Sequence, residues 1–125
     1  MSMDTIAKLL QLVVGVGLLN VWLLRARSKT AYRGGSALTL RQEFDTYGLP
    51  AGAFYVVGTL KVVAGVILLA ALWVPMPMPA RLAAGVVAGL MVGALLMHVK
   101  AKDPVRKSVP AAVMLAMCVG IVAMR

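Results

Sequence analysis

The sequence predicts an all-α polytopic membrane protein: a bundle of four transmembrane helices with a short amphipathic helix in the first connection. Of the 125 residues, 62% are hydrophobic and 14% are charged, whereas a typical soluble domain is about half apolar and about a quarter charged. The mean hydropathy is +0.92. The apolar residues form four continuous runs, and most charges lie between these runs. A domain of this length cannot bury so much apolar surface in water, so a soluble fold is disfavoured.

Each apolar run is long enough to cross a bilayer as a helix, which takes about 20 residues and at least about 17. We expect one transmembrane domain over residues 1–125, with helices at about 5–25, 51–74, 80–99 and 108–124. The fourth run is the shortest, and the flanking Lys107 and Arg125 side chains can reach the headgroup region. The first run lacks the basic start and the cleavage site of a signal peptide, so a retained helix is expected.

The net charge of +9 indicates membrane topology rather than a nucleic-acid surface, because the basic residues lie between the apolar runs. The first and third connections hold Arg25, Arg27, Lys29, Arg33, Arg41, Lys100, Lys102, Arg106 and Lys107. The opposite side has Lys8, Arg81 and Arg125. Since cytoplasmic loops are rich in Lys and Arg, both basic connections are expected in the cytoplasm and both termini outside. Trp22 and Trp73 are expected to anchor helix ends at the interface.

The first connection, residues 26–50, is expected to be interfacial or re-entrant and to contain the short helix. Thr39 followed three residues later by Gln42 is a helix-start signal. The apolar face of this helix, read from the helical spacing, comprises Leu40, Phe44 and Tyr47. Such a helix either lies on the membrane with no further role or enters the mouth of the bundle.

Small residues recur at four-residue spacing, which lets helices approach closely in lipid. The predicted helix-packing positions are Gly58, Gly65, Gly85, Gly89, Gly93, Ala112, Ala116 and Gly120. These positions serve either the bundle of one chain or an interface with another chain, and the pattern fits both. The expected partners are therefore the lipid bilayer and a protein partner or second copy of the chain, with no nucleic acid.

Lys61 is the charged residue nearest the middle of a predicted helix, where a charge costs about 2.5–3.5 kcal/mol on insertion scales. It shares a helix face with Gly58 and Gly65, so we expect it to point into the bundle. Two interpretations stay open. In the first, Lys61 contacts a substrate, a quinone or a proton path. In the second, it has no such role: its side chain extends to the membrane surface, or it is neutral and hydrogen-bonded to nearby polar groups. Glu43 reaches it only if the loop helix enters the bundle, and Tyr55 is another candidate partner.

His98 is the only histidine and lies near the end of the third run, close to Asp103. It is either a proton-exchanging group that Asp103 orients or a polar residue that closes a helix at the interface. The candidate ligand or proton-relay residues are therefore Lys61, His98, Asp103, Tyr55 and Glu43. The single Cys118 is expected to be a buried apolar residue, and no metal site is predicted.

Four segments have a familiar order. Gly48-Leu49-Pro50 ends the first connection, and Val57 to Gly65 places a charge in a glycine-rich helix. Gly93 to His98 is followed by Asp103, and Ser108 to Ala111 begins the last helix. This order resembles the DoxX-like family of small four-helix membrane proteins.

The resemblance implies a four-helix bundle in the cytoplasmic (inner) membrane. Members of the family are linked to a thiosulfate:quinone oxidoreductase, to oxidative or quinone stress and, in animals, to the assembly of receptor subunits. Many relatives have Glu at the position of Lys61, so the resemblance does not imply a fixed catalytic carboxylate.

Three functions follow as hypotheses. The first is an accessory or anchoring subunit of a redox or quinone-linked membrane system, with a quinone or lipid as the bound group. The second is a scaffold or assembly factor that packs against client helices. The third is a small carrier or proton-coupled channel that uses Lys61 and His98, although no internal repeat supports it. One His and one Cys supply little chemistry for a self-contained enzyme. Whether the chain has any catalytic activity stays open.

Overall fold

The computed structural model describes residues 2–24, 37 and 39–125. Its helices are α1 (Met3–Leu19), the π-helical segment η1 (Asn20–Leu24), α2 (Leu40–Thr46), α3 (Ala51–Ala70), α4 (Pro77–Lys100) and α5 (Val105–Met124). Four of these helices are long and apolar enough to cross a membrane: α1 with most of η1, α3, α4 and α5. The predicted all-α, four-helix membrane fold is therefore confirmed.

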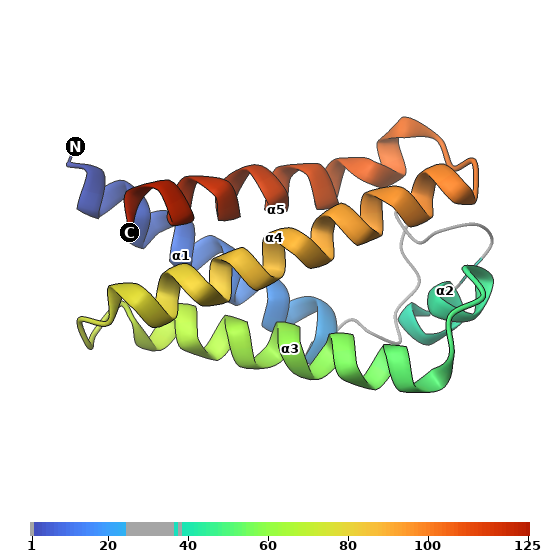
Figure 1. Ribbon diagram of the computed structural model, residues 1–125, viewed down its shortest axis with the longest axis horizontal. Coiled ribbons are helices and arrows are strands. Elements are labelled where there is room, and N and C mark those ends of the chain that lie inside the picture. The colour runs from blue at the N-terminus through green and yellow to red at the C-terminus, as the bar shows by residue number, and fades with distance from the viewer. Residues whose placement is uncertain (1, 25–36, 38) are drawn as a thin grey trace.

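The four long helices lie side by side, and consecutive helices run in opposite directions (Figure 1). Helix α1 contacts α3 and α5, and α4 also contacts α3 and α5. The order around the bundle is thus α1, α3, α4, α5, the simple up-and-down arrangement that short connections favour. Both chain termini lie at one end, here named the termini end, and α2 lies at the other, here named the α2 end (Figure 1).

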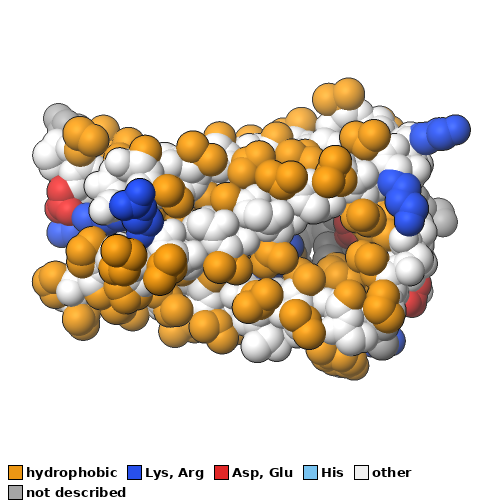
Figure 2. Space-filling model, viewed as in Figure 1, with side chains coloured by type: hydrophobic (Ala, Val, Ile, Leu, Met, Phe, Trp, Pro, Cys, Tyr) orange, Lys and Arg blue, Asp and Glu red, His pale blue; other side chains and the backbone are white. Residues whose placement is uncertain are grey.

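The core consists mainly of small side chains. It comprises Val14, Leu18, Ala64, Leu68, Ala71, Ala80, Ala83, Ala84, Val87, Met91, Ala111, Cys118 and Ile121. Because alanine predominates, the helix backbones approach one another closely. The outer surface is also apolar: valines and leucines such as Leu9, Val66, Val92 and Val113 are exposed, and hydrophobic side chains cover the face seen in Figure 2. This exterior suits contact with the lipid bilayer.

Three helix bounds differ from those expected from the apolar runs. Helix α3 ends at Ala70, four residues early, because Leu72 and Trp73 donate their N–H groups to Leu69 and Ala70 in tight turns. Helix α4 begins at Pro77 rather than near residue 80. A proline is tolerated in the first turn, where its missing N–H would have no intrahelical partner. Helix α5 begins at Val105, directly after Pro104.

The short amphipathic helix forms where Thr39 and Gln42 predict it. The Thr39 Oγ1 accepts a hydrogen bond from the Gln42 N–H at 3.1 Å, which satisfies one of the free donors at a helix start. Helix α2 packs against α3, so the helix lies at the mouth of the bundle. The predicted basic residues Arg25, Arg27, Lys29 and Arg33, and the side chain of Leu40, lie outside the described residues.

Candidate functional site at the α2 end

His98 and Asp103 are brought together by the turn that ends α4. The N–H of Asp103 donates to the His98 carbonyl at 3.0 Å, and the N–H of Lys102 donates to the Val99 carbonyl at 3.0 Å. This pair of bonds is a Schellman motif, with Lys102 in the left-handed conformation at φ 57°. The turn folds the chain back over the last helical turn. As a result, Asp103 Oδ2 lies 2.8 Å from His98 Nδ1, and both side chains are buried.

Tyr47 joins this pair from α2, which ends in the same motif. Gly48 has φ 74°, and the N–H groups of Gly48 and Leu49 donate to the carbonyls of Asp45 and Phe44. Tyr47, the last residue before this turn, is buried with 6% of its surface exposed. Its hydroxyl donates to Glu43 Oε1 at 3.2 Å.

Three further contacts fix Tyr47 against α4. The Tyr47 hydroxyl lies 3.2 Å from His98 Nδ1, and the two rings meet edge to face with their centroids 6.0 Å apart. The Lys100 ammonium donates to the Tyr47 carbonyl at 3.2 Å. Burial, followed by the negative charges of Glu43 and Asp103, raises the pKa of Tyr47 above its usual value of 10.0. Tyr47 is therefore a neutral phenol, able to donate one hydrogen bond and accept others.

The short contact to a carboxylate assigns the proton of the His98 ring. Asp103 accepts hydrogen bonds when ionised, so Nδ1 of His98 carries the hydrogen that points at Asp103 Oδ2. Lys107 Nζ lies 4.0 Å from the other carboxylate oxygen of Asp103. The His98 imidazole is thus held by the Asp103 carboxylate, which also faces the Lys107 ammonium. Such an arrangement orients the ring and leaves Nε2 as the acceptor.

Lys61, in the middle of α3, is half-buried. Its ammonium lies 5.4 Å from the centre of the Trp22 ring, within the range of a cation–π interaction. Gly58 makes this placement feasible, because a Cβ there would lie 2.6 Å from Trp22 Cζ3. The π-helical segment that contains Trp22 turns the indole toward α3, and π-helical turns are frequent at functional sites. The expectation that Lys61 points into the bundle agrees with this geometry.

An aromatic cluster, defined as Trp22, Phe44 and Phe54, lines the same region. The Trp22 ring centroid is 5.3 Å from that of Phe54 and 6.0 Å from that of Phe44, and the two Phe rings are 5.5 Å apart. The cluster joins η1, α2 and α3. Together with the polar groups it forms the α2-end site, defined as this cluster plus Lys61, Glu43, Tyr47, His98 and Asp103. Figure 2 shows the surface hollowed between α3 and α4 toward this end, with acidic and basic side chains at its edge.

The arrangement links groups that can hold and pass protons. His98 contacts Asp103 and Tyr47, and Tyr47 contacts Glu43. The aromatic rings of the cluster lie beside these polar groups and are inclined to one another by 42–88°. The site therefore combines apolar ring surfaces with hydrogen-bond donors and acceptors.

Tyr55 lies at the edge of the site, with its ring centroid 5.3 Å from that of Phe54. Tyr55 is 62% exposed, and its hydroxyl accepts a hydrogen bond from Arg41 at 3.4 Å rather than one from Lys61. Conversely, Tyr47 was expected only on the apolar face of the loop helix, and Trp22 only as an interfacial anchor. Each lies next to a turn or helix distortion that apolar spacing does not reveal. The signal that was available for Tyr47 is its position immediately before Gly48, the end of the short helix.

The predicted packing residues divide into two sets. Gly58 contacts Trp22, Gly65 lies against Gly15 and Leu18, and Gly120 lies against Leu10. In contrast, a Cβ at Gly85, Gly89 or Gly93 would meet nothing within 4 Å, and Ala112 and Ala116 are exposed. The second set therefore does not pack against the described residues of its own chain, and an interface with another chain stays a prediction for it.

Comparison with known protein families gives a match over most of the chain. A family model described as the DoxX-like family matches residues 21–121, a range that includes α3, α4 and all five polar residues of the α2-end site. No curated protein and no solved structure matches the chain.

Proposed function

This chain belongs to the DoxX-like family, and we propose that it is an accessory subunit of a quinone-linked redox system whose α2-end site binds the quinone headgroup. The observation that carries the proposal is the position of Lys61. Its ammonium lies 5.4 Å from the centre of the Trp22 ring, in the middle of α3. A charge at this depth is costly, and charged groups inside membrane helices commonly mark ligand or proton pathways.

The chemistry of the site matches a quinone. A quinone ring is flat and apolar, and its two carbonyl oxygens accept hydrogen bonds. The aromatic cluster offers faces and edges for stacking, and Lys61 offers up to three N–H donors. The linked Glu43, Tyr47 and His98 groups supply a route for protons that a reduced quinone takes up. In this proposal, a partner protein supplies the electrons.

A basic surface at the same end supports a soluble redox partner. Among the described residues it comprises Arg41, Lys100, Lys102, Arg106 and Lys107. By the excess of Lys and Arg, this end faces the cytoplasm and both termini face outside, in the cytoplasmic membrane. An acidic surface on the partner would be steered to this end.

The test is quinone binding by the full chain in detergent. Trp22 lies in the site and Trp73 lies at the termini end, so a Trp73→Phe background leaves Trp22 as the reporter. Decylubiquinone should quench its fluorescence, and Lys61→Met should weaken binding about tenfold or more, the loss expected for a hydrogen bond to a charged group. Arg81→Gln, a cation at the termini end, is the matched control and should bind normally. Equal binding by Lys61→Met and the control would reject the proposal.

The open small-residue face favours a second candidate, a scaffold or assembly factor. Gly85, Gly89 and Gly93 have no neighbours within 4 Å of a Cβ position, as a face that receives another helix would require. For this function Gly89→Leu should release a co-purifying membrane protein, whereas Lys61→Met should retain it. Quinone quenching that is unaffected by Lys61→Met, together with loss of the partner in Gly89→Leu, would favour the scaffold over the quinone site.

A further inference from the structure

A second polar cluster lies at the termini end, about the length of the bundle away from the α2-end site. Gln11 is fully buried in α1. Its side-chain amide donates to the Leu68 carbonyl at 3.1 Å, and its oxygen accepts from Arg125 Nε at 2.7 Å. In a continued helix the N–H of Leu72 would donate to the Leu68 carbonyl, but here it donates to the Leu69 carbonyl. Gln11 therefore satisfies a helix-end carbonyl and fixes the Arg125 guanidinium at the same time.

Asp4 holds two cations in place beside this link. Its Oδ1 accepts from Arg125 Nη1 at 2.7 Å, and its Oδ2 lies 3.2 Å from Lys8 Nζ. The two cations and one carboxylate leave one net positive charge. Arg125 has five N–H donors and Lys8 has three, so the contacts to Gln11 and Asp4 leave donors available on both. The Arg125 side chain is only 15% exposed, which limits its movement.

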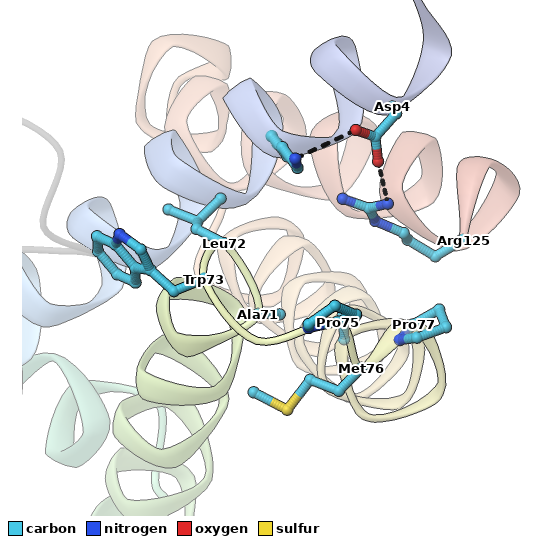
Figure 3. Close-up of a pocket in the computed structure, with 10 residues that line it drawn as sticks. Asp4, Ala71, Leu72, Trp73, Pro75, Met76, Pro77 and Arg125 are labelled. Carbon is cyan, nitrogen blue, oxygen red and sulfur yellow. Dashed lines mark hydrogen bonds and ion pairs between the residues drawn. The ribbon is translucent and has the colours of Figure 1, made fainter.

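These charged groups line a pocket of about 340 Å³. Figure 3 shows Asp4 and Arg125 on one side and the α3–α4 connection, with Pro75, Met76 and Pro77, on the other. The 24-residue helix α4 begins at Pro77, on the opposite side of this pocket from Asp4 and Arg125. The pocket therefore attracts an anion.

The surroundings indicate that the anion belongs to a lipid. The pocket lies where the ends of α1, α3, α4 and α5 meet, which is the level of the headgroups for helices that span a bilayer. Trp73 is 79% exposed and Met78 is 59% exposed beside it, and exposed tryptophan is typical of the interface. A volume of about 340 Å³ is near the lower limit of ligand pockets, about 300 Å³. It suits a headgroup whose acyl chains stay in the bilayer.

We propose that the pocket at the termini end binds the phosphate of a membrane phospholipid through Lys8 and Arg125. Asp4 positions the two cations, and Gln11 anchors Arg125 to the end of α3. The bound lipid would join α1 and α5 to the α3–α4 connection. This site is independent of the quinone site, since it shares no residue with it.

The test is native mass spectrometry of the full chain in detergent micelles. The probes are phosphatidylglycerol, a diacylglycerol with the same acyl chains and no phosphate, and inorganic phosphate. One phosphatidylglycerol should be retained, while the diacylglycerol should be lost. Inorganic phosphate at the same concentration should not displace the lipid.

Lys8→Gln is the decisive variant, because Lys8 is about half exposed and the Gln11–Arg125 link stays intact. It should weaken lipid retention about tenfold, the effect expected for one charge-assisted contact. Arg81→Gln removes a cation of the same end that does not line the pocket and should leave retention unchanged. Equal retention of the diacylglycerol, displacement by inorganic phosphate, or an equal loss in Arg81→Gln would each overturn the proposal.

Discussion

Gly15 lies at a close approach of α1 to α3, and an added methyl group there should destabilise the bundle. A Cβ at this position would lie 2.7 Å from Leu69 Cγ and 3.1 Å from the Gly65 carbonyl oxygen. The leucine side chain can rotate, but the carbonyl belongs to the backbone of α3 and moves only with the helix. Overpacking of this kind costs about 1–3 kcal/mol.

Gly17 provides a matched control on the same helix. A Cβ there would lie 3.4 Å from Cε of Met114, the end of a flexible side chain, so little strain is expected. Glycine-to-alanine substitution also favours the helix by about 1 kcal/mol, and this gain is common to both variants. The difference between Gly15→Ala and Gly17→Ala therefore isolates the contact with α3.

The assay is reversible unfolding of the detergent-solubilised monomer by sodium dodecyl sulfate, followed by circular dichroism. The free energy of unfolding should be lower for Gly15→Ala than for Gly17→Ala by about 1–3 kcal/mol. If the two variants are equally stable, α1 and α3 do not approach as closely as described, and the packing argument fails.

Three further predictions use the same unfolding assay. Lys102→Gly should stabilise the protein by about 1 kcal/mol, because glycine adopts the left-handed conformation without strain; Lys102→Ala is its control, and an equal gain there would contradict it. The free energy of unfolding of the wild type should fall as the pH rises above about 10, because the folded chain keeps the Tyr47 proton that the unfolded chain releases. If this free energy falls equally steeply with pH in Tyr47→Phe, another group is responsible. Gln11→Leu should cost about 1–3 kcal/mol, since it removes the partner of the Leu68 carbonyl and of the Arg125 Nε–H group, while the bond from Arg125 to Asp4 remains; unchanged stability would argue against that link.

The parts of the fold that the sequence predicts well depend on local signals. Helix length and number follow from the apolar runs, because a bilayer sets the length of a spanning helix. The start of α2 follows from Thr39 and Gln42, and its end from Gly48. His98 and Asp103 are five residues apart, so a single turn brings them together. Each of these features involves residues close together in the chain.

Contacts between distant residues were not predictable in the same way. In water an apolar helix face points inward, but in lipid both the inner and outer faces are apolar, so periodicity does not identify the buried side. For that reason the rows at Gly58 and at Gly89 looked alike in the sequence, although only the first packs within the chain. Gln11 and Arg125, 114 residues apart, share no pattern that would pair them.

Lys61 shows how stability and function can be separated in this bundle. A charge in the middle of a membrane helix costs about 2.5–3.5 kcal/mol, and a cation–π contact with Trp22 offsets about 0.5–2 kcal/mol of it. Lys61→Met removes both the cost and the contact while it keeps a side chain of similar length. The free energy of unfolding should therefore rise by about 0.5–3 kcal/mol. A fall of more than about 1 kcal/mol would mean that Lys61 is a structural element, held by partners stronger than Trp22. If Lys61→Met is as stable as the wild type or more stable, but binds decylubiquinone more weakly, then Lys61 serves ligand binding and not the stability of the fold.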